Sequence, residues 1–322
     1  MFPILKFNTI YKSVLWGGDR IAGFKGIASQ GSSIGESWEV SPLKDHESVV
    51  AEGEYKGIPL SDILASNGKE IMGQRLYNKY GNNFPLLIKF LDSADDLSIQ
   101  VHPDDELAAS RHDSPGKIEM WYSLLPSPTA YLYAGFNKSV TPDNFLEAVK
   151  NGEIISLLKR FTPRQGDVFL IPPGCVHALG KGNLVLEVQQ ASDVTYRIFD
   201  YNRRDAEGNL RELHVHESID AVDYSQAPRS AKNISSQTGK ELILEDCPHF
   251  TSTIINVKGH HILDLERRDS FSIVIATKGN HILTSPDGTT YPLHQGHTLL
   301  IPAVMPKVSV DGDGDIVTVF IN

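Results

Sequence analysis

Cysteine is scarce in this 322-residue chain, which contains only Cys175 and Cys247. Neither residue belongs to a Cys-x-x-Cys pair, so the sequence offers no disulfide framework and no zinc-finger spacing. A chain of this length can bury a sizeable hydrophobic core without covalent cross-links. We therefore expect a reduced, cytoplasmic setting.

Long apolar runs and an excess of positive charge are also missing. No apolar stretch approaches the ~18–20 residues that span a bilayer. Lys6 and Lys12 interrupt the apolar residues of the N-terminus, and no small-residue cleavage site follows, so a signal peptide is not expected. Lysine and arginine number 30 against 40 acidic residues, a net charge of −10. This balance argues against nucleic-acid and membrane partners but allows a small anionic substrate, for which a few local cations suffice.

Short runs of β-branched residues, bounded by Gly, Pro, Asp or Asn, dominate the chain and predict an all-β sandwich or barrel core. The expected strands lie at residues 37–42, 86–91, 97–101, 167–171, 184–189, 271–277 and 298–301. Helical periodicity is confined to residues 60–65 with 70–80, 104–110, 141–151 and 153–160. Asp104 or Asp105 is a candidate N-cap, and Thr141 followed by proline is a helix-start signal.

The segment 224–240 is rich in Ser, Gln, Lys and Pro and poor in large apolar residues. This composition is typical of a linker. We expect a domain at residues 1–225 that carries helical insertions, a linker at 226–240 and a second domain at 241–322.

An internal repeat supports two related domains. Residues 166–172 read GDVFLIP and residues 296–302 read GHTLLIP, and each copy predicts a strand that ends at a proline turn. The offset of 130 residues places Lys307 where the first copy has His177. We interpret the pair as a duplicated β-domain with one functional copy and one degenerate copy that binds no metal.

A polar triplet interrupts the apolar segment 97–101. Side chains alternate along a strand, so Ser98, Gln100 and His102 are expected on one face, with alternate Cα atoms roughly 7 Å apart. Long side chains at that spacing can converge on one metal ion. The alternative is a set of hydrogen-bonded residues that line a solvated barrel mouth, because burying such groups without partners is costly.

Two further segments favour a metal site. Lys117 and Glu119 form another alternate polar pair on an expected strand, and His177 follows a tight Pro-Pro-Gly turn. Together with Gln100 and His102, these segments offer two imidazoles, one carboxylate and one amide oxygen. Such a set suits catalytic zinc, which keeps a position for water or substrate. Non-haem iron or manganese are alternatives.

Two other features of the sequence are candidates for metal binding or catalysis, but we assign neither of them to the site. His214 and His216 form a second His-x-His motif, but they follow a polar stretch and precede Glu217, so we expect an exposed segment that enters a short helix. Cys175 stands two residues before His177 with no second base at a helpful position, and we interpret it as a small buried residue rather than a nucleophile.

The residues resemble the type I mannose-6-phosphate isomerases in their short bacterial form, a family of the cupin superfamily. The matching segments are residues 15–18, 35–39, 85–92, 98–105, 117–122, 166–180 and 187–200. The resemblance runs from about residue 10 to about residue 225. It implies an all-β-dominated fold of two jelly-roll (cupin) β-barrel domains with a few short helices, the second domain being degenerate.

The resemblance also implies a function and a set of site residues. The implied reaction is the zinc-dependent interconversion of D-mannose 6-phosphate and D-fructose 6-phosphate through an enediolate. One zinc ion per chain is expected on Gln100, His102, Glu119 and His177. Phosphate contacts map onto Lys89 and Ser98, and the catalytic arginine maps onto Arg197. Lys117, Glu187 and Asp193 fall on further active-site positions.

The residue types fit this chemistry. An aldose–ketose isomerase moves a proton between C1 and C2, and a metal and an arginine stabilise the charge that develops on the oxygens. Glu187, Asp193, Lys117 and a zinc-bound water are alternatives for the general base. Asp193, Thr195 and Arg197 share one face of an expected strand, where a structural salt bridge from Arg197 to Asp193 or Asp200 is the competing interpretation.

Two other functions remain possible from the sequence. One is a bicupin that binds a sugar phosphate without turnover, against which the intact ligand set and Arg197 argue. The other is an iron-dependent cupin oxygenase, which differs in its bound metal because zinc does no redox chemistry. The expected partner in each isomerase or binding function is a small-molecule sugar phosphate.

Overall fold

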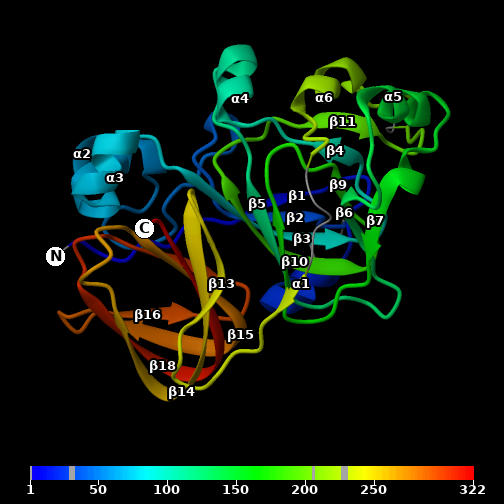
Figure 1. The fold of residues 1–322 in the computed structure, drawn as a ribbon. Helices are drawn as coiled ribbons and strands as arrows, with labels where there is room; N and C mark the ends of the chain where they lie inside the picture. The colour runs from blue at the N-terminus through cyan, green and yellow to red at the C-terminus, as the bar shows by residue number, and fades with distance from the viewer. Residues whose placement is uncertain (1, 29–32, 205–206, 226–230) are drawn as a thin grey trace.

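The computed structural model describes residues 2–28, 33–204, 207–225 and 231–322. Strands dominate, and Figure 1 shows two β-rich lobes, with the C-terminal strands in orange and red gathered in one of them. The N-terminal lobe has a seven-stranded antiparallel sheet in the order β1-β2-β3-β10-β5-β8-β12 and a five-stranded one in the order β11-β4-β9-β6-β7. The C-terminal lobe has a six-stranded sheet, β13-β14-β18-β15-β16, with β17 paired to β15.

The strand bounds follow the expected segments closely. The seven-stranded sheet contains β1 (Ile10–Lys12), β2 (Glu36–Val40), β3 (Leu86–Ser93), β5 (Glu119–Ser123), β8 (Asp167–Ile171), β10 (Asn183–Gln190) and β12 (Lys232–Asn233). The five-stranded sheet contains β4 (Ile99–Val101), β6 (Leu132–Phe136), β7 (Leu158–Phe161), β9 (His177–Leu179) and β11 (Tyr196–Phe199). The C-terminal sheet contains β13 (Leu242–Cys247), β14 (Phe250–Asp264), β15 (Ser272–Thr284), β16 (Thr290–Leu293), β17 (Thr298–Ile301) and β18 (Lys307–Phe320). None of these described sheets closes on itself, so neither expected jelly-roll domain forms a closed barrel.

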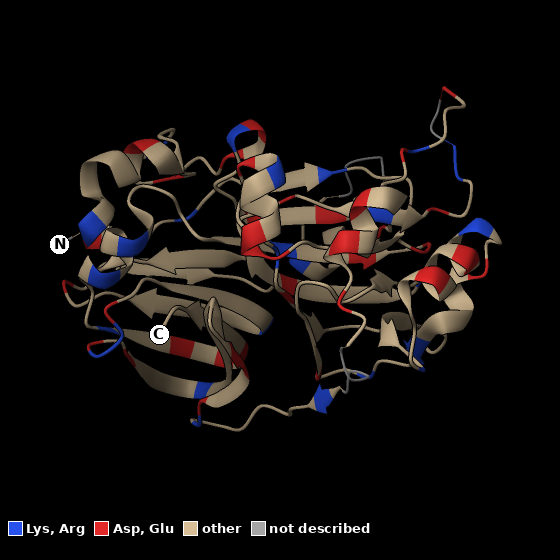
Figure 2. Ribbon diagram, turned by 45° about the horizontal axis from the view of Figure 1, so that its top comes forward, with Lys and Arg blue, Asp and Glu red and all other residues tan. Residues whose placement is uncertain are grey.

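Helices are short and lie mainly outside the sheets (Figure 1). They are α1 (Arg20–Lys25), η1 (Lys44–His46), α2 (Leu60–Met72), α3 (Gln74–Tyr80), α4 (Asp105–His112), α5 (Pro142–Lys150), η2 (Ile154–Leu157) and α6 (Val215–Ala221). The expected caps are confirmed, since Asp104 accepts the Leu107 amide at the start of α4 and Thr141 accepts the Asn144 amide at the start of α5. Charged residues fall mostly on helices and loops (Figure 2). No described helix has the length and apolarity to span a bilayer.

The prediction of a second helix over residues 153–160 is wrong in its C-terminal half. A single 3₁₀ turn, η2, occupies the first half, and β7 follows it directly. β7 pairs with β6 at the edge of the five-stranded sheet, and Leu158 at its start is buried. Sheet pairing therefore overrides a helical pattern that is too short to be stable alone.

The core of the N-terminal lobe has two sides because side chains alternate along each strand. On one face of the seven-stranded sheet, Ile88 of β3 and Val188 of β10 join a core that extends into the C-terminal lobe through residues such as Phe271. On the opposite face, Leu91 and Trp121 pack in a smaller cluster between the two N-terminal sheets. Side chains that share this second face therefore point into the space between the two sheets.

The internal repeat is visible in the structure. β8 and β17 occupy the repeated segments, and the glycines before them, Gly166 and Gly296, both adopt a positive φ, 86° and 77°. His177 is the first residue of β9, and Lys307 is the first residue of β18. The two chain segments thus have the same strand–turn–strand arrangement, with a histidine in one and a lysine in the other.

Candidate metal centre and cavity

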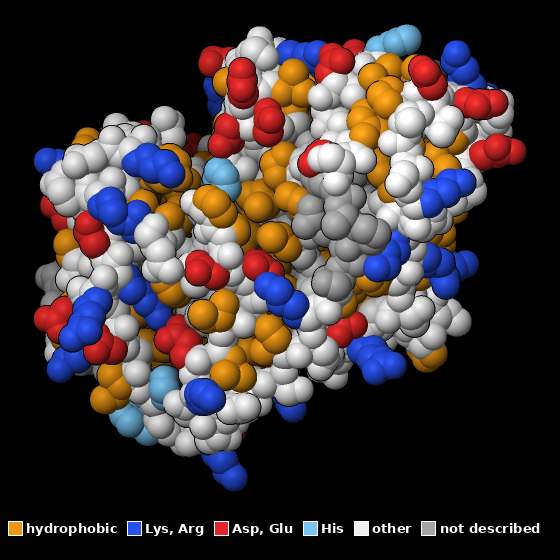
Figure 3. Space-filling model, viewed as in Figure 1, with side chains coloured by type: hydrophobic (Ala, Val, Ile, Leu, Met, Phe, Trp, Pro, Cys, Tyr) orange, Lys and Arg blue, Asp and Glu red, His pale blue; other side chains and the backbone are white. Residues whose placement is uncertain are grey.

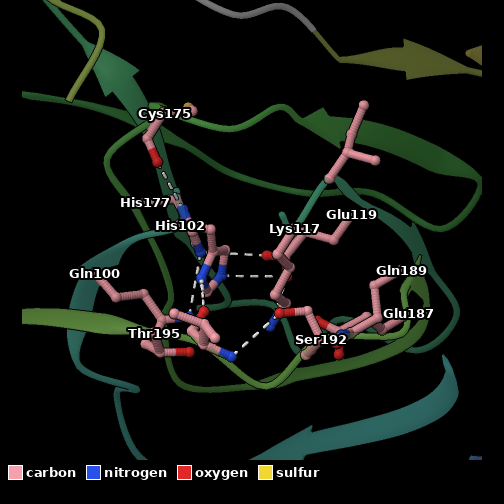
Figure 4. Close-up of polar contacts among 12 residues, drawn as sticks. Gln100, His102, Lys117, Glu119, Cys175, His177, Glu187, Gln189, Ser192 and Thr195 are labelled. Carbon is pink, nitrogen blue, oxygen red and sulfur yellow. Dashed lines mark hydrogen bonds and ion pairs between the residues drawn. The ribbon is translucent and has the colours of Figure 1, made fainter. Parts of the chain in front are cut away.

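Three potential metal ligands converge between the two N-terminal sheets. His102 follows the end of β4, Glu119 begins β5 and His177 begins β9. Their ligand atoms lie within 4.8 Å of one another, and all three residues are buried. Figure 4 shows the two imidazoles directed toward Glu119. The Nε2 atoms of His102 and His177 lie 3.4 Å and 3.2 Å from the oxygens of Glu119.

Backbone carbonyls hold both imidazoles in one orientation. Nδ1 of His102 is 3.0 Å from the carbonyl oxygen of Val194, and Nδ1 of His177 is 2.8 Å from that of Cys175. A carbonyl oxygen only accepts, so each Nδ1 carries the proton and each Nε2 presents a lone pair to the cluster. Burial, together with the charge of Lys117, lowers the pKa of His102 to about 3, which keeps this imidazole neutral.

Glu119 is ionised despite its burial. Burial raises the pKa of this carboxyl, but the ammonium of Lys117, 3.1 Å away, holds the pKa well below its ordinary value. Neither oxygen of Glu119 has a hydrogen-bond partner among the described residues, and neither does Nε2 of His102. Buried polar atoms without partners are costly, so this pattern favours a cation between them.

The fourth expected ligand, Gln100, stands beside this cluster. It pairs with His177 across β4 and β9, and its Nε2 lies 3.2 Å from Nε2 of His177. The oxygen and nitrogen of a carboxamide exchange places by a 180° rotation, which would direct Oε1 at the same position. Two imidazoles, one carboxylate and one amide oxygen fit a zinc ion with an open coordination position.

A cavity of about 290 Å³ opens beside the cluster. Its lining includes seven of the expected site residues, namely Lys89, Ser98, Gln100, Lys117, Glu187, Asp193 and Arg197. The remaining three, His102, Glu119 and His177, form the buried cluster. The structure therefore brings all ten expected residues into one region of the N-terminal lobe.

An ion pair crosses the floor of this cavity. Lys89 of β3 and Glu187 of β10 are paired in register, and Nζ of Lys89 lies 3.2 Å from Oε2 of Glu187. Trp121 of β5 donates its indole N–H to the other carboxylate oxygen at 2.9 Å. Although burial disfavours the ammonium, the negative charge of Glu187 raises the pKa of Lys89 above its ordinary value. Both side chains are charged and fixed in place.

Arg197 reaches the cavity from β11, whose backbone pairs with β4 opposite Gln100. Its Nη1 donates to the carbonyl of Glu212 at 2.9 Å. Within the described part of the chain it makes no salt bridge to Asp193 or Asp200. The competing interpretation, in which Arg197 serves only as the partner in such a salt bridge, is therefore wrong. Its Nε is buried and has no hydrogen-bond partner among the residues that the structure describes.

The competing motifs have structural roles. His214 precedes α6 as its N-cap residue, its Nδ1 lies 3.2 Å from the amide of Arg197, and His216 is exposed. Cys175 is buried and provides the carbonyl oxygen that orients His177. Both interpretations from the sequence are confirmed.

Several contributors to the site were missed from the sequence, among them Trp121 and Arg211. Trp121 shares the parity of Glu119 on β5, a signal that the sequence pattern contained. Arg211 lines the cavity although it belongs to a polar stretch that predicts an exposed segment. Nothing local in the sequence distinguishes it from Arg203 or Arg204 nearby.

Comparisons with known proteins agree with this geometry. Residues 4–120 match the family profile described as phosphomannose isomerase type I, catalytic domain, and residues 240–321 match mannose-6-phosphate isomerase, cupin domain. The chain is 34% identical over 312 residues to mannose-6-phosphate isomerase ManA of Bacillus subtilis, covering 96% of each chain. It is 31% identical over 316 residues to mannose-6-phosphate isomerase of Streptococcus mutans, covering 98% of this chain and 97% of that one.

A solved structure extends the likeness to three dimensions. The crystal structure of the mannose 6-phosphate isomerase from Bacillus subtilis superposes with a TM-score of 0.88 at 30% identity, covering 98% of this chain and 99% of that chain. Both sequence and fold therefore match over nearly the whole length, and the cupin architecture expected from the residues is confirmed. The chain belongs to the type I phosphomannose isomerase family, a family of mannose-6-phosphate isomerases.

Proposed function

We propose that this protein interconverts D-mannose 6-phosphate and D-fructose 6-phosphate, with one zinc ion held by Gln100, His102, Glu119 and His177. The observation that carries the proposal is the buried cluster of three converging ligand groups at the wall of a cavity lined by both cations and carboxylates. A bound zinc would act as a Lewis acid that stabilises negative charge on the substrate oxygens next to the reacting carbons.

The cavity is small and suits one hexose phosphate. Its volume of about 290 Å³ lies near the lower end of the range for small-molecule sites, about 300–1,000 Å³. Trp16 and Trp38 contribute apolar lining, while Ser98 offers a hydroxyl close to Gln100. We assign the phosphate contact to Lys89 and Ser98, which both line the cavity.

Arg197 is assigned to the charge that develops during reaction. Isomerisation passes through an enediolate, in which one negative charge is distributed over the C1 and C2 oxygens as the proton moves. The unpartnered Nε of Arg197 is a donor held ready for such an oxygen, and a donor fixed before reaction needs no reorganisation. This assignment makes its effect larger in the transition state than in substrate binding.

The proton must move between C1 and C2 by way of a base in the cavity. Glu187 is held by Lys89 and Trp121, and Lys117 is held by Glu119. The side chain of Asp193 lines the cavity and makes no ion pair among the described residues. We therefore assign the proton transfer first to Asp193, with Glu187 and Lys117 as groups that position the substrate and the metal ligand.

A coupled assay tests the proposed function. Mannose 6-phosphate is supplied, fructose 6-phosphate is measured, and the reaction is repeated in deuterium oxide with mass analysis of the product. We expect turnover with deuterium incorporated from solvent, because a base that exchanges its proton carries the transfer. An absence of fructose 6-phosphate would overturn the assignment of substrate and reaction. Asp193→Asn that retains wild-type turnover would overturn the assignment of the base.

A further inference from the structure

The cations that line the cavity differ in how their charge is balanced. Lys89 faces Glu187 at 3.2 Å, and Lys117 faces Glu119 at 3.1 Å. Each lysine therefore contributes little net positive charge to the cavity. Arg197 lines the same cavity and has no carboxylate partner in the described ranges. A doubly charged phosphate needs more net positive charge than two balanced lysines provide.

The second cation without a close partner is Arg211. Its Nη1 lies 3.6 Å from Oδ1 of Asp200, and 33% of its side chain is exposed to solvent. The same carboxylate oxygen is bonded directly by Arg203, whose other terminal nitrogen donates to the carbonyl of Asp96. One carboxylate thus serves two guanidinium groups, and Arg211 has the longer and weaker contact. The charge of Arg211 is only partly compensated.

Arg197 lies within the electrostatic influence of Arg211. Burial lowers the pKa of this guanidinium, and the charge of Arg211 lowers it further, ahead of the opposing effect of Asp200. The two arginines therefore repel each other across the lining of the cavity. A phosphate bound by Arg211 would offset this repulsion.

We propose that Arg211 is a substrate-binding residue, which holds the phosphate group of the sugar phosphate from the segment that follows β11. This assignment deepens the proposed function and rests on it. In the absence of substrate, Asp200 keeps the guanidinium near the cavity at 3.6 Å, too far for a close hydrogen bond. A phosphate has three terminal oxygens and accepts the paired N–H groups of a guanidinium, so it competes well with that contact.

The phosphate interaction is made in both the bound substrate and the transition state. Its loss should therefore raise the Michaelis constant more than it lowers turnover. Hydrogen bonds between charged groups correspond to a change in affinity of about 10- to 100-fold. Arg211→Gln should raise KM by this factor and weaken competitive inhibition by inorganic phosphate similarly. Arg211→Lys should recover part of the affinity, because it retains the charge but not the planar pair of donors.

Arg204 provides a matched control on the same segment. It is exposed, its Nη1 donates to the carbonyl of Gly208, and it is outside the lining of the cavity. Arg204→Gln removes the same charge from the same segment, and we expect both KM and phosphate inhibition to stay within about twofold of the wild type.

Steady-state kinetics on the metal-loaded wild type and the three variants test the proposal, with melting temperature and metal content measured on each. An Arg211→Gln variant that folds and loads metal normally, yet keeps wild-type KM and phosphate inhibition, would overturn it. An equal rise in KM and an equally weakened phosphate inhibition in Arg204→Gln would also overturn it, because the effect would then come from overall charge. If Arg211→Gln has a lower melting temperature than the wild type, the test rests on Arg211→Lys. Wild-type KM and unchanged phosphate inhibition in Arg211→Lys would then contradict phosphate binding by Arg211. A wild type that does not isomerise mannose 6-phosphate would instead refute the proposed function itself.

Discussion

The ion pair between Lys89 and Glu187 allows a prediction with a defined magnitude. Lys89 retains 7% of its exposure and Glu187 retains 3%, and their charged atoms lie 3.2 Å apart. At an effective dielectric constant of about 20, this separation corresponds to an attraction of roughly 5 kcal/mol before desolvation is subtracted. Removing Glu187 leaves the buried ammonium of Lys89 without its ion-pair partner. Such a change typically costs about 3–5 kcal/mol.

Glu187→Gln isolates this effect because glutamine still offers an oxygen to the indole N–H of Trp121. We expect the free energy of unfolding to fall by about 3–5 kcal/mol, because the ammonium of Lys89 stays in the cavity wall. The double variant Lys89→Met with Glu187→Gln removes both charges and keeps the volume. Its decrease in the free energy of unfolding should be smaller, by about 2 kcal/mol or more, than the sum of the decreases in Lys89→Met and Glu187→Gln alone. Buried partners in contact do not act additively.

Urea unfolding of the metal-saturated protein measures these differences, with melting temperature as a second observable. The exposed pair of Lys6 and Glu52 is the control, because their separation of 3.5 Å is similar and their side chains keep 25% and 59% exposure. Glu52→Gln should change stability by less than about 1 kcal/mol. Additive losses in the double variant, or a loss below about 1 kcal/mol for Glu187→Gln, would refute the argument that these charges depend on each other.

Three further predictions concern the site and the pH dependence. Arg197→Ala should lower turnover by roughly 10²–10³-fold with zinc still bound, as measured by kinetics and elemental analysis, and a change in KM alone would contradict its role. His102→Ala should lose both zinc and activity while His216→Ala keeps both, and zinc retained by the first variant would refute the ligand assignment. Burial and the charge of Lys25 lower the pKa of His297 to about 4. The folded protein therefore favours the neutral imidazole, and this contribution to the free energy of unfolding is complete above about pH 6.5 and is lost as the pH falls toward 4. After allowance for screening, His297→Gln should reduce acid destabilisation in that interval by about 1 kcal/mol in urea titrations, and an unchanged pH profile would contradict this.

Much of the fold could be predicted from the sequence because local signals carried it. Short β-branched runs bounded by turn residues located seven of the eighteen described strands, and Asp104 and Thr141 marked the beginnings of α4 and α5. The segment after Glu153 was predicted incorrectly because its partner, β6, is distant along the chain. A pattern of four to eight residues does not distinguish a short helix from an edge strand when pairing decides between them.

Part of the candidate metal site was predictable for the same reason, since Gln100 and His102 are two residues apart on one face. The ion pair between Lys89 and Glu187 was not, because it depends on the register between β3 and β10 across almost 100 residues of chain. Arg211 was missed because its position depends on how the segment after β11 turns back over the cavity. Contacts of this kind are set by tertiary structure and leave no periodic signal in the sequence.

A zinc titration of the metal-free protein tests the central claim most directly, namely that the buried cluster of His102, Glu119 and His177 holds the metal on which isomerisation depends. Chelated protein is given increasing zinc, and turnover of mannose 6-phosphate is followed together with bound zinc. The account predicts negligible turnover without metal, a linear rise to one zinc per chain and a plateau beyond it, with no recovery in His177→Ala. Full turnover in the metal-free protein, or recovery in His177→Ala equal to that of the wild type, would contradict it.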